Sequence, residues 1–150
     1  MSVEERAESY FNSGYNCAQS VLLAVSEQLG VKTEAAEPLI PRIATGFGGG
    51  IARNGDCCGA LSGATMSLSL VLGCNKPDES RDTCYEATDL LYNEFLQKFG
   101  TCKCRNLTGL DLKTIEGREE LHSRIQHEVC DRIVRWSARR AFQLIQDPRR

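Results

Sequence analysis

Glycine and cysteine are concentrated in one stretch of this sequence, GFGGGIARNGDCCGALSG, which spans residues 46–63. Seven of these eighteen residues are glycine, and two adjacent cysteines lie among them. Because glycine adopts backbone conformations that other residues avoid, such a stretch can turn sharply and approach another group closely. We therefore expect a loop that brings the backbone close to a centre served by Cys58.

The segment before this loop carries helical signals. Apolar residues at helical spacing predict a short helix over Val3–Phe11. Asn16 is a suitable N-cap for a second helix, which closes at Gly30. Thr33 caps a third segment that runs to about Ala36.

Three further helices are expected after the loop. Asp56 is the predicted N-cap of a helix that ends near Leu72, and Ser80 opens a helix that ends at Gly100. A final long helix is predicted over residues 118–146. The expected buried stripes are Tyr85, Thr88, Leu91, Tyr92, Phe95 and Phe99 in the second of these helices, and Leu121, Ile125, Val129, Ile133, Trp136 and Leu144 in the last.

No alternating pattern typical of a β-strand is found in the sequence. We see no internal repeat and no linker. The sequence therefore predicts an all-α fold, a single-domain bundle over residues 1–150 with about five to six helices and a glycine-rich loop before the CGALSG helix.

Charge and composition restrict the expected partners and location. The net charge of −2 and the aromatic content of 7% predict no nucleic-acid partner, because attraction to phosphates and base stacking would both be weak. The opening MSVEERAESYF lacks the pattern of a secretory signal, and no apolar run approaches the roughly 20 residues that a membrane span needs. We therefore expect a cytoplasmic protein without membrane association.

Eight cysteines are many for a cytosolic chain, where they point to metal binding or redox chemistry. No two are spaced as CxxC, which argues against a thioredoxin motif, a zinc ribbon and covalent haem attachment. Cys17 follows the cap Asn16, and Cys57 and Cys58 follow the expected cap Asp56. Because a helix N-terminus favours a thiolate, we expect reactive sulfur at both helix starts.

Small residues mark one face of the CGALSG helix. Gly59 and Gly63 lie four residues apart, so another helix or a cofactor can approach the backbone closely there, and we expect the two glycines to contact a cofactor. The same face suggests a homodimer. Arg53 in the glycine-rich loop either meets an anion or is solvated. The G-x-G pattern of GFGGGI is weak evidence for a nucleotide site, since no strand precedes it.

The other cysteines and the histidines give fewer clues. The CKC sequence at 102–104 can share a metal or form a strained, reducible disulfide. Cys130 lies near the apolar stripe of the last helix, where a lone cysteine is most often a small hydrophobic residue. We expect Cys74 and Cys84 to be incidental and His122 and His127 to be surface residues.

Four stretches in order, GYNCAQSVLL, FGGGIARNGDCCGALSGA, FGTCKCRNLTG and EVCDRIV, resemble the C_GCAxxG_C_C family of redox-active proteins. The resemblance covers nearly the whole chain from about residue 7, and CGALSG fits the family's C-G-A-x-x-G motif. It implies that the four signature cysteines are Cys17, Cys58, Cys104 and Cys130. Cys57 and Cys102 are extra cysteines beside the motif positions.

Four thiolates suit a [2Fe–2S] or [4Fe–4S] centre. We therefore expect a cytosolic electron-transfer protein whose redox-active residues and metal ligands are Cys17, Cys58, Cys104 and Cys130. Its redox partner is not identified by the sequence. Three alternatives stay open: a metal-free thiol–disulfide centre, a structural zinc site in an interaction module, and a structural helical dimer with buried thiols.

Overall fold

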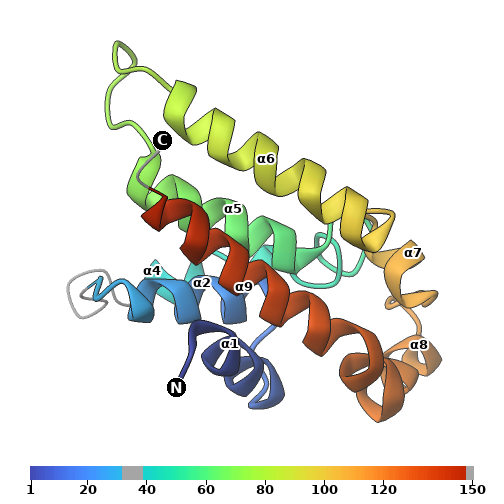
Figure 1. Cartoon of the computed structure of the whole chain (residues 1–150). Coiled ribbons are helices and arrows are strands. Elements are labelled where there is room, and N and C mark those ends of the chain that lie inside the picture. The colour runs from blue at the N-terminus through green and yellow to red at the C-terminus, as the bar shows by residue number, and fades with distance from the viewer. Residues whose placement is uncertain (32–38, 148–150) are drawn as a thin grey trace.

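A computed structural model describes residues 1–31 and 39–147 (Figure 1). In order along the chain, its helices are α1 (Val3–Asn12), α2 (Cys17–Gln28), α4 (Leu39–Arg42), the 3-10 helix η1 (Thr45–Phe47), α5 (Gly59–Leu72), α6 (Asp82–Phe99), α7 (Cys104–Thr108), α8 (Ile115–Glu120), the π-helix η2 (Leu121–Cys130) and α9 (Asp131–Gln146). Within these two ranges the only β-structure is an isolated bridge between Cys57 and Lys103. The all-α prediction is confirmed, and short helices raise the number above the expected five to six. The predicted segment at residues 33–36 lies outside the described residues.

The core forms where α2, α5 and α9 meet. α9 runs between α1 on one side and α5 and α6 on the other (Figure 1). Its buried side chains, among them Ile133, Val134 and Leu144, share one apolar cluster with Val21 of α2 and Leu68 of α5. Burying a large apolar side chain contributes about 1.5–3 kcal/mol, so this cluster holds the three helices together. None of the helices in the described ranges is long and apolar enough to span a bilayer.

Local capping chemistry fixes several helix ends as the sequence predicts. The Asn16 side chain accepts a hydrogen bond from the backbone N–H of Gln19, and the Gln19 side chain accepts one from the N–H of Asn16. This capping box satisfies two N–H groups at the start of α2. At other ends Gly30 and Gly100 adopt left-handed φ values of 67° and 84°. The predicted cap at Asn16 and the predicted stops at these glycines are confirmed.

The predicted cap of α6 is confirmed, and that of α5 is wrong. α5 begins at Gly59, and Cys58 stands in the N-cap position in place of Asp56. Asp56 instead pairs with Lys103, because the backbone around it is bound to residues 102–105. α6 begins at Asp82, whose N–H donates to the hydroxyl of Ser80 at 3.1 Å, so Ser80 caps the start of this helix.

The predicted buried stripe of α6 is only partly right. Leu91 and Phe95 are fully buried, whereas Tyr85 is 65% exposed and Tyr92 is 43% exposed. The buried positions instead include Ala87. α6 packs mainly against α5 and α9, so a narrow face suffices to cover it.

The last predicted helix is a succession of three segments. It begins at α8, passes through the π-helix η2 and continues as α9 (Figure 1). The predicted inner face is confirmed at Ile125, Ile133, Trp136 and Leu144, all of which are buried. π-helical segments are rare and often occur at functional sites, so η2 marks the region around Cys130, its last residue.

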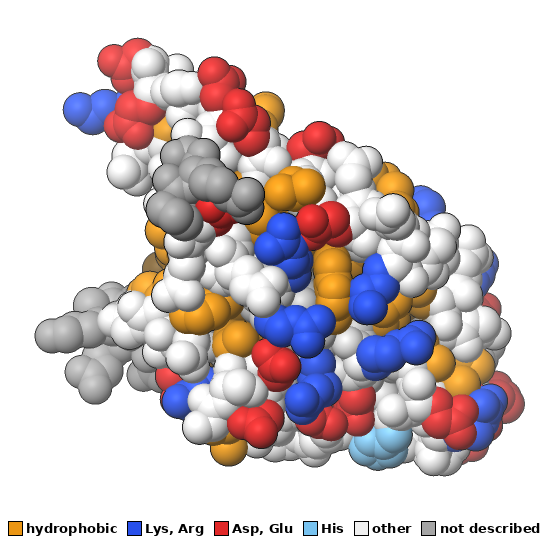
Figure 2. All heavy atoms as spheres, viewed as in Figure 1, with side chains coloured by type: hydrophobic (Ala, Val, Ile, Leu, Met, Phe, Trp, Pro, Cys, Tyr) orange, Lys and Arg blue, Asp and Glu red, His pale blue; other side chains and the backbone are white. Residues whose placement is uncertain are grey.

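Basic side chains gather over α9 on the face shown in Figure 2, with acidic ones beside them. Three of the four arginines of this helix are paired with acidic residues of its neighbours. Arg135 pairs with Glu8, Arg139 lies 3.6 Å from Glu4, and Arg140 lies 2.5 Å from Glu94. These pairs connect α9 to α1 and α6, which gives this basic surface a structural role.

Candidate functional site: a cavity beside four cysteines

Cys17 is the first residue of α2 and faces the glycine-rich loop and the start of α5. A Cβ atom at Gly59 would collide with Cys17 Sγ and would lie 2.9 Å from the carbonyl oxygen of Phe47. A Cβ atom at Gly63 would collide with the carbonyl oxygen of Ala18. Gly59 and Gly63 therefore allow α5 to approach α2 of the same chain. Their predicted contact with a cofactor and the predicted homodimer stay predictions, and this face no longer argues for a dimer.

Cys58 and Cys104 are held by two extended segments that pair side by side. The N–H of Cys58 donates to the carbonyl of Cys102, and the N–H of Cys104 donates to the carbonyl of Asp56, both at 2.7 Å. The bridge between Cys57 and Lys103 lies between these two bonds. Residues that are 46 positions apart in the sequence are thus brought together by backbone pairing, and both Cys58 and Cys104 are buried.

The glycine-rich loop forms the wall next to these sulfurs through an unusual backbone. Five consecutive residues, from Gly49 to Arg53, have φ between 49° and 68°. Ile51, Ala52 and Arg53 are not glycine, and each such residue costs about 1–2 kcal/mol in a left-handed helical conformation. Strain of this kind clusters at functional sites. The predicted approach of this loop to the cysteine centre is confirmed, since a Cβ at Gly50 would lie 2.7 Å from Cys104 Cβ.

One cavity of about 710 Å³ connects these elements. Cys17 from α2, Cys104 from α7 and Cys130 from the end of η2 all line it, together with Gly48 and Gly49 of the loop. Cys58 borders the same group, because it interacts electrostatically with Cys17 and Cys104. The structure thus brings the four predicted cysteines together, and we call Cys17, Cys58, Cys104 and Cys130 the inner cysteines.

Burial raises the pKa of every inner thiol. It raises the pKa of Cys104 to about 11 and that of Cys130 to about 12, and the neighbouring thiols act in the same direction. It also raises the pKa of Cys17, and that of Cys58 well above the ordinary value.

Backbone N–H groups act against burial at two of these thiols. Those of Gly49, Ala18 and Gly59 lower the pKa of Cys17, and those of Ala60 and Leu61 lower that of Cys58. The N–H groups at the helix starts thus lower the thiol pKa values as predicted, but burial raises these values by more. The expectation of lowered thiol pKa values at the helix starts is therefore wrong.

Cys57 and Cys102 form a second group, which we call the outer cysteines. The hydroxyl of Ser62 donates to Cys57 Sγ at 3.7 Å, and Lys103 acts to lower the Cys57 pKa that burial raises. Cys102 raises the pKa of Tyr92 through its charge and a side-chain hydrogen bond. The sequence shows both cysteines as extras, but it contains no signal that they lie together or that Tyr92 joins them.

The other cysteine and histidine side chains lie outside the cysteine centre or at the surface, as the residue patterns suggest. Cys84 is buried on α6, where its Sγ lies 3.7 Å from Ser69 Oγ. His122 and His127 are exposed, and His127 Nδ1 lies 3.0 Å from Asp131. Throughout residues 1–31 and 39–147, no three His, Cys, Asp or Glu side chains are grouped so that they could hold one metal ion.

Comparison with known proteins supports the family resemblance. The family model described as "Putative redox-active protein (C_GCAxxG_C_C)" matches residues 15–144, which include all four inner cysteines. An uncharacterized protein of Archaeoglobus fulgidus is 29% identical over 126 residues, which cover 78% of this chain and 82% of that relative. No solved structure matches the chain.

Proposed function

Because this chain belongs to the C_GCAxxG_C_C family, we propose that its inner cysteines hold an iron–sulfur centre that transfers electrons. One observation supports this proposal above the others. Three cysteines from separate segments line one cavity, and Cys58 lies beside them, where Cys17 and Cys104 both act to raise the pKa of its thiol. The other cysteines in the described residues lie outside this group. If these four cysteines served only as small hydrophobic residues in the core, their sulfurs would not need to lie near one another.

The donor set fits such a centre. Iron–sulfur clusters are held by cysteine thiolates, and a bound cluster would supply a site that accepts and releases single electrons. A tetrahedral zinc site would need its sulfurs about 4 Å apart around one ion, given a Zn–S distance of about 2.3 Å. No three ligating side chains in the described part of the chain are grouped in that way. The four inner cysteines would hold a cluster through their thiolates, which is the donor set such clusters take.

The chain's own residues would tune the centre. Backbone N–H groups of Gly49 and Gly59 point at Cys17 Sγ, and those of Ala60 and Leu61 point at Cys58 Sγ. Hydrogen bonds to ligand sulfur favour the charged, electron-rich form and thereby raise the reduction potential. Burial of Cys58 and Cys104 limits the access of water to two of the four sulfurs.

Anaerobic purification followed by a visible spectrum tests the proposal. We expect visible absorption that bleaches on reduction by dithionite, with iron and sulfide present in stoichiometric amounts. A protein that stays colourless after reconstitution with iron and sulfide would contradict the proposal. In that case thiol titration in a defined redox buffer would test a metal-free thiol–disulfide centre, and zinc analysis would test a structural zinc site.

A further inference from the structure

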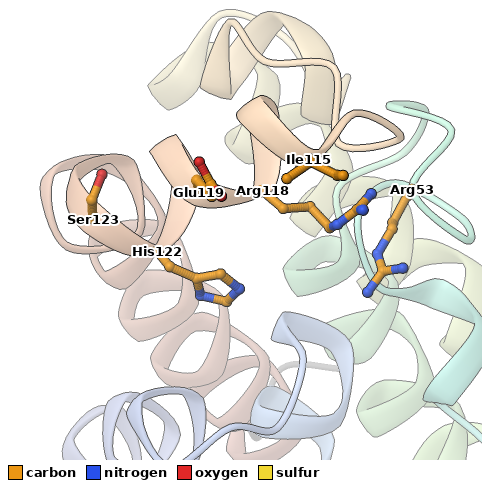
Figure 3. A pocket seen from close by; sticks show the side chains of 6 residues that line it. All are labelled: Arg53, Ile115, Arg118, Glu119, His122 and Ser123. Atoms are coloured by element: carbon orange, nitrogen blue, oxygen red, sulfur yellow. The ribbon is translucent and has the colours of Figure 1, made fainter.

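Two arginines face a common space beside the inner cysteines. In Figure 3 the Arg118 side chain extends from α8 toward the side chain of Arg53, and the ring of His122 lies across the same hollow. These residues line a surface hollow of about 610 Å³, and they also line the 710 Å³ cavity that contains Cys17 and Cys104. The surface hollow and the cysteine cavity are therefore adjacent and have these three lining residues in common.

The two guanidinium groups have no acidic partner in the described part of the chain. Arg118 donates from Nη1 to the backbone carbonyl of Leu112 at 2.9 Å, and neither Arg53 nor Arg118 forms an ion pair. Glu119 lines the same hollow but pairs with neither of them. Three arginines of α9 differ, because Arg135, Arg139 and Arg140 are each matched by a glutamate, and the fourth, Arg132, lies over the ring of Phe99.

Bringing two like charges together without a counter-charge is unfavourable, and an anion between them removes the repulsion. A guanidinium group also presents paired N–H donors that match the oxygens of a carboxylate, phosphate or sulfur oxyanion.

The fold fixes the backbone of Arg53 and the side chain of Arg118. Arg53 is the last residue of the left-handed run that begins at Gly49, and its own N–H donates to the carbonyl of Gly48 at 3.2 Å. The strained turn therefore sets where the exposed Arg53 side chain leaves the backbone. The Arg118 side chain is held by its bond to the carbonyl of Leu112, and a side chain held in place loses less entropy when it binds a ligand.

We propose that Arg53 and Arg118 bind the oxyanion group of a small reactant and hold this reactant at the mouth of the inner-cysteine cavity. The oxyanion is recognised by the two guanidinium groups, and the rest of the reactant lies toward Cys17, Cys104 and Cys130. The assignment of this molecule as the redox reactant rests on the proposed function, whereas oxyanion binding itself does not.

Isothermal titration calorimetry at low salt tests oxyanion binding with two probes, inorganic phosphate and oxidised glutathione, a carboxylated disulfide. We expect the wild-type protein to bind at least one of them, and Arg53→Gln and Arg118→Gln each to weaken that binding at least tenfold. The tighter probe identifies the oxyanion as a phosphate or a carboxylate. Arg124→Gln is the matched control, since Arg124 is bound to Glu120 and Glu128 and lines neither cavity.

Two results would overturn the proposal: wild-type protein that binds neither probe, or arginine variants that bind as the Arg124→Gln control does. Cys58→Ser separates this proposal from the proposed function. We expect this variant to lose the redox centre and to keep oxyanion binding, because Cys58 does not line the cavity. A wild-type protein that loads a cluster but binds no probe would contradict only the present inference. Arginine-dependent binding by a protein that loads no cluster would contradict only the proposed function.

Discussion

Cys57 and Cys58 are neighbours in the sequence, but their side chains have different surroundings. Cys58 belongs to the inner cysteines and interacts with Cys17 and Cys104. Cys57 belongs to the outer cysteines and interacts with Cys102, with a serine hydroxyl and with the charged pair of Asp56 and Lys103. The difference arises because adjacent residues of an extended segment point to opposite sides. The comparison teaches that the CC pair is a boundary between two environments and does not act as one vicinal dithiol.

The largest expected effect is that of Cys58→Ser. We expect it to abolish cluster loading, because a serine hydroxyl is far too weak an acid to replace a thiolate ligand at neutral pH. The helices should remain, with a loss of about 1–2 kcal/mol in unfolding free energy at this buried position. Iron and sulfide analysis and circular dichroism measure the two outcomes.

Cys84→Ser is the control for this variant, since Cys84 is equally buried but lies on α6 outside the cavity. We expect it to keep the wild-type iron content. If Cys58→Ser also kept wild-type iron content and thiol reactivity, the distinction between inner and outer cysteines would be lost.

Gly59→Ala disturbs the wall behind Cys17. The added methyl group would collide with Cys17 Sγ and meet the carbonyl of Phe47, so α5 and α2 must move apart. Overpacking of this kind costs about 1–3 kcal/mol, which urea denaturation measures. Gly46→Ala is the matched control, because no atom lies within 4 Å of a Cβ at that position. Equal stability of the two variants would show that the close approach at Gly59 is not required.

The pH dependence of stability sharpens the comparison in the metal-free, reduced protein. The folded-state pKa values of Cys104 and Cys130 are raised to about 11 and about 12 from an ordinary value of 9.0. The folded state therefore binds more protons than the unfolded state between these values. The stability from these thiols is fully present below about pH 9 and is lost as the pH rises through 11 to 12.

Urea midpoints measured at intervals from pH 8 to pH 11 test this expectation. Other groups also titrate in this range, so the wild type is compared with the Cys104→Ser/Cys130→Ser variant. We expect the variant to show a shallower decline. An equal decline in both proteins would mean that the two thiols do not experience the burial described here.

The smallest effect is expected from Cys57→Ser combined with Cys102→Ser. These side chains contact Ser62 and Tyr92, so we expect cluster content within about twofold of the wild type and a stability change of about 1 kcal/mol or less. Iron analysis and urea denaturation measure both quantities. Loss of the centre would show that an outer cysteine is a ligand.

Sequence patterns predict those parts of the fold that depend on neighbouring residues. The sequence predicts the cap at Asn16 and the stops at Gly30 and Gly100, because capping involves residues within one turn. Asp56 is not a cap because its partner, Lys103, is 47 residues away. The residues next to Asp56 in the sequence therefore do not indicate that it pairs with Lys103.

The candidate site divides in the same way. The family resemblance selects the four inner cysteines by their motif positions, whereas their convergence depends on the pairing of residues 56–58 with residues 102–104. The left-handed conformation at Ile51 could not be predicted, because a β-branched residue normally avoids it. Arg118 is inconspicuous in the sequence, since only the folded chain places it next to Arg53.

The π-helix η2 sets the rotational phase between α8 and α9. Each residue of an α-helix turns the chain by about 100°. Deleting one residue from η2 would therefore rotate α8, which precedes it, relative to the buried stripe of α9. Half of the residues of η2 are exposed and Ile125 is its only buried residue, and an exposed segment ordinarily tolerates changes in length. Here a single deletion would turn Arg118 away from Arg53, although both residues would remain in the chain. The spacing between Arg118 and Cys130 is thus as specific a property of this protein as the identity of either residue.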